Sequence, residues 1–353
     1  MGLGELPAMK QMTIYDIAKL ANVSVATVSR VINDTAPVKH STREKIEQII
    51  QEHQFEPNAM ARSLLKKETG TIGIIVPDLT NPFYTEVLAG AEQEAITSGL
   101  TFLLTNSIGN YKKESEYLAI MREKRVDGMI FIGGRINLRA ADEELDQELI
   151  QHASVIPTVL VNGTVKGNNL TRVLTDEYKG ACIAVQHLID SGHQSIGFLG
   201  GETHMSTTAT KLRAFRRTLK NAELEVCEDW IKTDSFSINS GYEQMLKLMQ
   251  LPERPTAVFC INDFVAIGAI KAAVDQGVNV PEDISIIGFD DIPLSHHFIP
   301  EITTVSQQAI ELGRTAVQVL FKLMNQEKVK KQTVIEPVLK VRQSSTAIKA
   351  KAH

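Results

Sequence analysis

Polar and aromatic side chains stand where several short apolar runs of this 353-residue chain end, and their types suit the binding of a hydroxyl-rich molecule. Carboxylates and amides form paired hydrogen bonds with hydroxyl groups, and aromatic rings stack on the apolar face of a sugar. We therefore predict a site for a neutral polyol. The candidates are Asp78, Phe83, Tyr84, Asn162, Asp176, Asn262, Asp263 and Asp290.

Several of these candidates also have a purely structural interpretation. Asp263 can cap the helix expected over "DFVAIGAIKAAV", and Asp176 can cap the helix that follows it. Phe83 and Tyr84 can pack inside the fold instead of facing a ligand. For these residues the sequence leaves both interpretations open.

The elements that must position the candidates begin at Thr71, where strand-length apolar runs alternate with helical stretches. This alternation is typical of parallel sheets covered on both faces. A first series holds "TIGIIVP", "LTFLLT", "DGMIFIGG" and "PTVLVN"; a second holds "RVLTDE", "SIGFLGG", "AVFCIND" and "ISIIGFDD", followed by a helix near 308–325 and a strand near 334–342. Two doubly wound sheets predict two lobes, with a ligand cleft at the carboxyl ends of their strands.

Three short helical patterns precede the sheets. In the first, "TIYDIAKLA", Thr13 and Asp16 have the spacing of a capping box. Ser24 can cap a second helix that runs to about Ile32. In the third, "STREKIEQIIQEH", Ser41 and Glu44 offer another capping box. These patterns predict a small three-helix bundle.

The second helix of this bundle has the features of a DNA reader. Val25, Ala26 and Arg30 are expected to face outward, where Arg30 can bond a guanine edge and the two apolar residues can contact a thymine methyl. Ser24, Thr27 and Ser29 can donate to phosphate oxygens. By pattern alone, an ordinary amphipathic helical hairpin with a solvated face is an equal alternative.

Composition and charge limit the function classes. The net charge of −5 argues against a wholly basic nucleic-acid coat, although residues 1–68 carry +1 and the remainder −6. Cys182, Cys227 and Cys260 show neither a close pair nor metal-ligand spacing, which indicates a reducing compartment. We find no export signal and no membrane-spanning run, and we expect a cytoplasmic protein without metal or cofactor.

Two other functions fit the sequence less well. An enzyme is disfavoured because neither G-x-G-x-x-G after the first strand nor G-x-x-x-x-G-K-[ST] occurs, and His193, His296 and His297 are interpreted as surface or loop residues. A transport-type solute receptor shares a two-lobed fold, but the helix-turn-helix pattern argues against it.

From Thr13 to about Ser345 the chain resembles the LacI/GalR family of bacterial transcription regulators, near the catabolite-control and ribose or purine repressor branches. The segments that carry the resemblance are "TIYDIAKLANVSVATVSRVIN", "PNAMARSLL", "IGIIVPDLTNPFY", "KRVDGMIFIG", "LIDSGHQSIGFLGG", "RPTAVFCINDFVAIGA" and "VPEDISIIGFDD".

The resemblance implies a homodimer on a pseudo-palindromic operator, with residues 58–65 forming a hinge helix that folds on DNA. Leu64 would insert into the minor groove and kink the duplex. The implied DNA-contacting residues are Thr13, Ser24, Val25, Ala26, Thr27, Ser29, Arg30, Asn33, Asn58, Ala61, Arg62, Leu64 and Leu65.

The resemblance also implies an effector pocket between the lobes. Its expected residues are Phe83, Tyr84, Asn162, Asp176, Thr207, Lys211, Phe236, Asn262, Asp263 and Asp290. The sequence departs from the family at Lys211, where an arginine is usual, and at Gly163, where a bulky residue is usual. Lysine lacks the planar fork of arginine, so the identity of the effector stays open.

We therefore expect a repressor of carbohydrate genes, controlled by a sugar or sugar phosphate. The alternative is a catabolite-control regulator whose co-regulator is a seryl-phosphorylated phosphocarrier protein. The expected parts are an all-α headpiece over 1–57, a hinge and linker over 58–70, a periplasmic-binding-protein-like α/β core over 71–346 and a tail over 347–353. One lobe of the core is expected over about 71–176 and 306–332, the other over about 177–305 and 333–346.

Overall fold

The structure is a computed structural model that describes residues 12–34, 36–53, 55, 68–167 and 169–348. The chain forms two compact units, Met1–Thr69 and Gly70–His353. Within the described ranges, no helix has both the length and the apolar character needed to cross a membrane. The expected hinge residues Asn58, Ala61, Arg62, Leu64 and Leu65 lie outside these ranges.

The first unit is a three-helix bundle of α1 (Ile14–Ala21), α2 (Val25–Asn33) and α3 (His40–Glu52). The predicted caps of α1 and α2 are confirmed, because Thr13 and Asp16 form a capping box and Ser24 accepts from the backbone of Thr27. Between the helices, Asn22 adopts the left-handed conformation that ends α1 and makes the turn tight. Ile17, Val28 and Ile46 are completely buried and form the centre of the bundle.

The predicted capping box at Ser41 and Glu44 is wrong. Helix α3 already begins at His40, and Lys39, which stands at its N-cap, makes no side-chain capping bond. Since Ser41 lies inside the helix, it cannot occupy the position from which a side chain caps the first turn.

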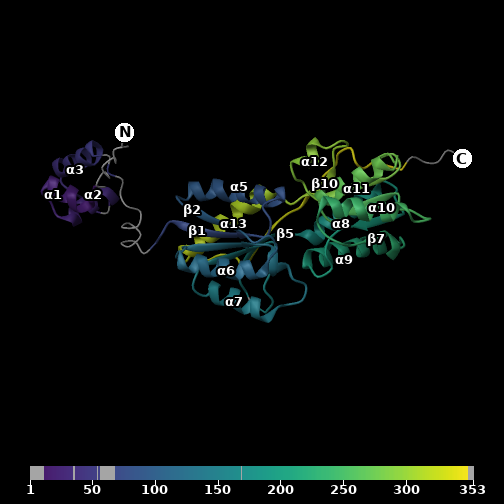
Figure 1. The fold of residues 1–353 in the computed structure, drawn as a ribbon, viewed down its shortest axis with the longest axis horizontal. Helices are drawn as coiled ribbons and strands as arrows, with labels where there is room; N and C mark the ends of the chain where they lie inside the picture. The colour runs from purple at the N-terminus through teal and green to yellow at the C-terminus, as the bar shows by residue number, and fades with distance from the viewer. Residues whose placement is uncertain (1–11, 35, 54, 56–67, 168, 349–353) are drawn as a thin grey trace, which may run out of the picture. The chain divides into compact units, whose positions relative to one another are not determined.

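The second unit contains two six-stranded sheets with helices on both faces (Figure 1). The first sheet has the order β11-β5-β4-β3-β1-β2, and neighbouring strands in it run parallel. Helices α5 and α13 cover one face, and α6 and α7 lie below the other face in Figure 1. We call this sheet and its helices the first lobe. Its elements are β1 (Thr71–Val76), α5 (Pro82–Thr97), β2 (Thr101–Asn106), α6 (Tyr111–Glu123), β3 (Gly128–Ile132), η1 (Gly134–Asn137), α7 (Glu143–Ala153), β4 (Thr158–Val161), β5 (Thr171–Thr175), α13 (Ala309–Met324) and β11 (Gln332–Ile335).

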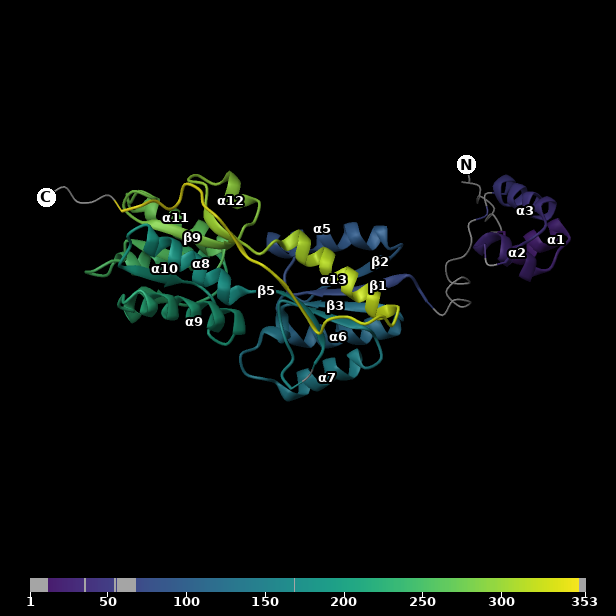
Figure 2. The ribbon, with the colours of Figure 1, turned by 180° about the vertical axis from the view of Figure 1, so that it is seen from behind.

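The second lobe, at the left of Figure 2, is built around a sheet of order β12-β10-β9-β8-β6-β7. In this sheet β12 runs antiparallel to β10, and the other neighbours run parallel. Helix α8 packs against α9, and α10 packs against α11. Its elements are α8 (Glu177–Asp190), β6 (Ile196–Leu199), α9 (Ser206–Asn221), η2 (Glu228–Trp230), β7 (Ile231–Lys232), α10 (Ile238–Met249), β8 (Ala257–Cys260), α11 (Asp263–Asp275), β9 (Ser285–Asp290), α12 (Leu294–His297), β10 (Thr303–Ser306) and β12 (Val338–Lys340).

The single strand predicted near 334–342 is two strands in different lobes. Strand β11 pairs with β5 in the first sheet, and β12 pairs with β10 in the second. Pro337 stands between them and cannot donate a ladder hydrogen bond, so the pairing breaks there. The predicted start of the second lobe's last segment at 333 is therefore wrong, since residues 333–335 belong to the first sheet.

His193 lies in the loop between α8 and β6, as one of its two interpretations held, but it is not at the surface. Its ring is buried and bonds the hydroxyls of Thr256 and Ser285 and the carbonyl of Thr346. Burial lowers the pKa of His193 below its ordinary value. His296 and His297 are exposed. No local periodicity could reveal the burial of His193, because its partners come from segments far along the chain.

Candidate functional site

The predicted DNA-reading helix α2 and its N-cap expose three of the six side chains over 24–30 that were expected to touch DNA. Ser24, Ala26 and Arg30 are exposed, whereas Thr27 and Ser29 are half-buried. Val25 was expected to face outward, but it is half-buried and packs against the bundle core. Its side chain is thus only partly available to a thymine methyl.

Helix α1 adds two residues that sequence reasoning did not single out. Tyr15 is 72% exposed and Leu20 is 50% exposed, although both are large side chains in a small bundle. Thr13, which was expected to contact DNA, is exposed and bonds Asp16 through its hydroxyl. An exposed tyrosine next to the helix start could have been recognised from the helical phase of Ile14, Ile17 and Ala18.

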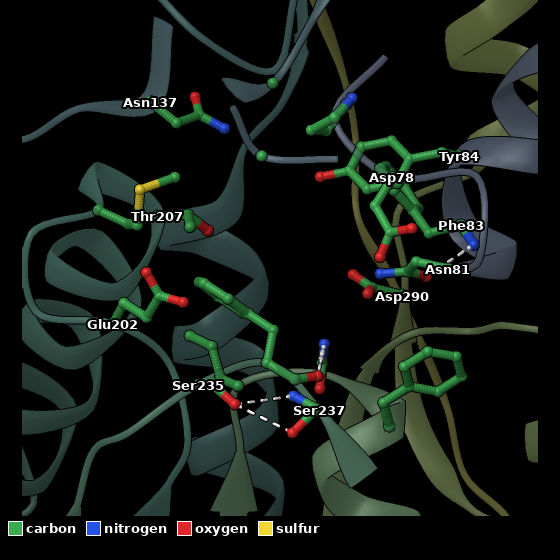
Figure 3. Close-up of a pocket in the computed structure, with 18 of the residues that line it drawn as sticks. Asp78, Asn81, Phe83, Tyr84, Asn137, Glu202, Thr207, Ser235, Ser237 and Asp290 are labelled. Carbon is green, nitrogen blue, oxygen red and sulfur yellow. Dashed lines mark hydrogen bonds between the residues drawn. The ribbon is translucent and has the colours of Figure 1, made fainter. Parts of the chain in front are cut away.

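The second unit encloses a cavity of about 820 Å³ at the carboxyl ends of its strands (Figure 3). In each sheet it lies at the point where the strand order reverses, beside β1 and β3 in one lobe and beside β6 and β8 in the other. Such switch points are where open α/β sheets bind ligands. Of the predicted residues, the cavity brings together Asp78, Phe83, Tyr84, Asn162, Thr207, Lys211, Phe236, Asn262 and Asp290.

Two predicted carboxylates do not line the cavity. Asp176 caps α8, as its structural interpretation held. Asp263 is completely buried, where its carboxylate accepts from the Thr304 hydroxyl at 2.5 Å and the Ile292 backbone at 2.8 Å. It does not cap α11 either, because Asn262 holds that position.

Asp290 is held in place by a chain of hydrogen bonds between the lobes. The amide of Gln307 donates to the Asp290 carboxylate at 2.6 Å, and Asn162 donates to the Gln307 oxygen at 2.9 Å. The Asn162 oxygen accepts from the backbone of Thr175. Burial raises the pKa of Asp290 to about 6, although Lys211 and the Gln307 bond act in the opposite direction. The chain of hydrogen bonds thus orients the Asp290 carboxylate through its Oδ1 atom, at the wall of the cavity.

Lys211 is nearly buried beneath the cavity and has close partners of its own. Its ammonium lies 3.2 Å from Oε1 of Glu177, 3.2 Å from the Ile261 carbonyl and 3.8 Å from the centroid of the Phe289 ring. The Thr207 hydroxyl donates to the same Glu177 oxygen at 2.5 Å. Helices α8 and α9, which carry these residues, pack together and fix the pair.

The first lobe presents aromatic rings to the cavity. Asn81 caps α5 by accepting from the backbone of Phe83, and Pro82 occupies the first turn. Phe83 and Tyr84 pack edge to face, with ring centroids 5.3 Å apart. In Figure 3 the Tyr84 hydroxyl points into the open space. Burial and the nearby Asp290, Glu177 and Asp78 raise the pKa of Tyr84, so its hydroxyl stays a neutral donor.

A buried ion pair supports the cavity wall formed by η1. Nε of Arg135 lies 2.9 Å from the Glu114 carboxylate, and Nη1 lies 2.5 Å from Glu148. Its neighbours Gly133, Gly134 and Asn137 line the cavity. A Cβ on Gly134 would lie 2.1 Å from a Glu114 oxygen, so glycine is required at this close approach.

Sequence reasoning missed several lining residues, above all polar ones in loops. Gln307 follows the strand "TTVS" directly, so a search of every strand end would have found it, and Glu177 stands next to the predicted Asp176. The missed polar residues are Thr80, Asn81, Tyr111, Asn137, Glu177, Glu202, His204, Ser235, Ser237, Asn239 and Gln307. Within the described part of the chain, no group of three or more potential metal ligands comes together.

Comparisons with known proteins match both parts of the chain. The sequence model of bacterial regulatory proteins of the lacI family matches residues 13–58, and that of a periplasmic binding protein-like domain matches residues 185–345. Catabolite control protein A of Priestia megaterium is 40% identical over 327 residues, which cover 92% of this chain and 96% of that protein. The HTH-type transcriptional repressor PurR of Photobacterium profundum is 35% identical over 333 residues, covering 94% and 98%.

The chain is also similar to a solved structure of the same family. The lac repressor dimer bound to operator and the anti-inducer ONPF is 26% identical with a TM-score of 0.85, and the match covers 96% of this chain and 100% of that one. A helix-turn-helix unit followed by a two-lobed α/β core defines a DNA-binding transcriptional regulator. The chain belongs to the lacI family of bacterial regulatory proteins. The predicted family and the predicted fold class are confirmed.

Proposed function

We propose that this regulator represses carbohydrate genes as a homodimer, with a small sugar bound between its two lobes as the allosteric effector. The observation that carries this proposal is the oriented Asp290 carboxylate, which faces the cavity together with the Tyr84 hydroxyl and the amide-bearing Asn162. Charged and amide acceptors around an aromatic ring suit the hydroxyl pattern and the apolar face of a sugar.

The position of the cavity between the lobes explains how a bound sugar would change the affinity for operator DNA. A ligand that contacts both lobes favours the lobe arrangement in which all its contacts form. If that arrangement differs in its affinity for operator DNA, the ligand changes DNA binding by the same coupling free energy, typically about 1–3 kcal/mol. In the proposal, residues 58–65 transmit this change as a hinge helix, and Leu64 enters the minor groove.

The test is a sugar screen followed by a DNA titration. Thermal shift with a panel of neutral sugars identifies a ligand, and fluorescence anisotropy with an operator selected from random DNA then measures operator affinity with and without it. We expect the ligand to change operator affinity about 5- to 150-fold. A sugar that stabilises the protein but leaves operator affinity unchanged would refute the effector role.

The proposed DNA-reading role of helix α2 is tested separately at Arg30. Replacing Arg30→Ala should relax the preference at one base pair in each half-site, because the bidentate contact to a guanine is lost. Lys19→Ala, which removes an exposed cation from α1, serves as the control and should leave the base preference unchanged. Selection experiments that return the same consensus for both variants would contradict the role of Arg30.

A second candidate function is favoured by the 40% identity to catabolite control protein A. In this alternative the co-regulator is a seryl-phosphorylated phosphocarrier protein. The operator titration separates the two candidates: addition of the phosphorylated carrier protein alone should strengthen operator binding only if the alternative holds.

A further inference from the structure

The two basic side chains that line the cavity, Lys211 and His204, each lie beside a carboxylate. Lys211 lies 3.2 Å from Glu177, and Nε2 of His204 lies 3.3 Å from Glu202. Two further carboxylates, Asp78 and Asp290, also line the cavity, and no arginine is among its described lining residues. These lining residues therefore carry an excess of negative charge.

Lys211 is the lining side chain best suited by charge to receive an anion, and its surroundings prevent this. Its side chain is 4% exposed. Its ammonium forms an ion pair with the Glu177 carboxylate and donates a hydrogen bond to the Ile261 carbonyl, while the Phe289 ring covers a further side. An incoming phosphate would have to displace Glu177, which the Thr207 hydroxyl holds in place.

We propose that Glu177 is a specificity-determining residue: by pairing with Lys211 it excludes ligands that carry a phosphate or carboxylate group, so that the effector is an uncharged sugar. This inference rests on the proposed function, in which the cavity binds a sugar. The physical reason is that an anion entering the cavity would be desolvated beside like charges without gaining an ion pair. In Figure 3 the carboxylates of Glu202 and Asp290 face the open space from opposite sides, which adds to this repulsion.

The experiment compares matched neutral and phosphorylated ligands on the full chain. Ribose with ribose 5-phosphate, glucose with glucose 6-phosphate, and inorganic phosphate are titrated by calorimetry into the wild type and into Glu177→Gln. Glu202→Gln is the control, since it removes the same charge from the cavity wall without releasing Lys211. We expect the wild type to bind no phosphate compound more tightly than its neutral parent.

Glu177→Gln should gain at least about tenfold in affinity for inorganic phosphate or a phosphate ester, because Lys211 then keeps a donor for the anion. Glu202→Gln should change these affinities less than about threefold. Equal gains in the two variants would overturn the proposal, since general charge reduction would then explain them. No gain in a Glu177→Gln protein that melts cooperatively and binds operator would also overturn it.

Two outcomes separate this inference from the proposed function. If the wild type prefers a sugar phosphate to its parent sugar, the charge exclusion is wrong while sugar-dependent regulation stands. If no sugar binds the wild type but Glu177→Gln acquires phosphate binding, the charge exclusion stands and the sugar effector is wrong. Should Glu177→Gln fail to fold, the matched pairs on the wild type still decide the preference for uncharged ligands.

Discussion

The two lobes supply different chemistry to the same cavity. The first lobe contributes the rings of Phe83 and Tyr84 and a single lining carboxylate, Asp78, among its described residues. The second lobe contributes the rings of Phe236 and Phe264, the three carboxylates of Glu177, Glu202 and Asp290, and Lys211. Asp290 and Lys211 are less than 10% exposed. Aromatic rings stack on sugars of many kinds, whereas a buried carboxylate stabilises only a sugar whose hydroxyl is placed to hydrogen-bond to it. If the cavity binds a sugar as proposed, we expect most of the selectivity to come from the second lobe, which carries three of the four lining carboxylates.

The two lobes nevertheless begin their cavity helices in the same way. Asn81 caps α5 after β1, and Asn262 caps α11 after β8, in each case where the strand order reverses. After the first cap the chain continues with Pro82 and the aromatic pair, and after the second with the buried Asp263 and the cavity-lining Phe264. Both helix starts thus bring an aromatic side chain to the cavity, and the second adds a buried carboxylate behind it.

The largest effect is expected at Asp290 in the second lobe. Replacing Asp290→Asn keeps the size of the side chain and removes its charge. Asparagine, like aspartate, tolerates the positive φ of 110° at this position. Hydrogen bonds to charged groups contribute about 1.5–3 kcal/mol each, so the affinity for the effector should fall about 10- to 150-fold. Calorimetry with the sugar found in the screen measures this, and operator affinity without sugar should be unchanged.

The control for this variant is Asp275→Asn, which makes the same change at an exposed position of α11, where Asp275 bonds Lys271 and Tyr242. Its sugar affinity should equal that of the wild type. If Asp290→Asn also stays within about threefold of the wild type, selectivity does not reside in the second lobe and the comparison fails.

A smaller effect is expected in the first lobe at Tyr84. Tyr84→Phe keeps the ring and removes one neutral donor, so sugar affinity should fall about tenfold or less. The loss should be similar for sugars of different stereochemistry, whereas the loss at Asp290 should depend on it. Tyr117→Phe is the control, because the Tyr117 hydroxyl bonds the Asn106 carbonyl outside the cavity. Stereochemical discrimination by Tyr84→Phe would show that the first lobe is selective as well.

The sequence predicts this site well where a residue follows a strand, and poorly where its role depends on distant partners. Asp290 and Asn162 were found because parallel strands end at one edge of a sheet. Asp263 was misassigned because its partners, Thr304 and Ile292, lie 41 and 29 residues away. Periodicity likewise predicted the three helices of the first unit, some helices of the second and most strands. It could not separate β11 from β12, since pairing partners and not local pattern decide which sheet each joins.

The smallest expected effect is on the pH dependence of stability, to which Asp290 of the second lobe should contribute and Tyr84 of the first lobe should not. The pKa of Asp290 is about 6 in the folded protein against an ordinary value of 3.8, so between about pH 4 and 6 the folded state binds more protons than the unfolded state. The free energy of unfolding should therefore fall as pH rises, with Asp290 accounting for about 1 kcal/mol between pH 5 and 7. Tyr84 adds no slope in this window because its raised pKa keeps it neutral.

Urea unfolding of the wild type and Asp290→Asn at pH 5, 6 and 7 measures this contribution as the difference between their slopes. Burial and the charge of Asp290 also raise the pKa of Asp263, so the difference between the slopes reports Asp290 together with its effect on Asp263. Identical slopes would mean that Asp290 is not desolvated in the free protein. Because ionised Asp290 costs stability in the empty cavity, a sugar hydroxyl that bonds it should recover part of that cost, and effector affinity should increase as pH rises through about 6.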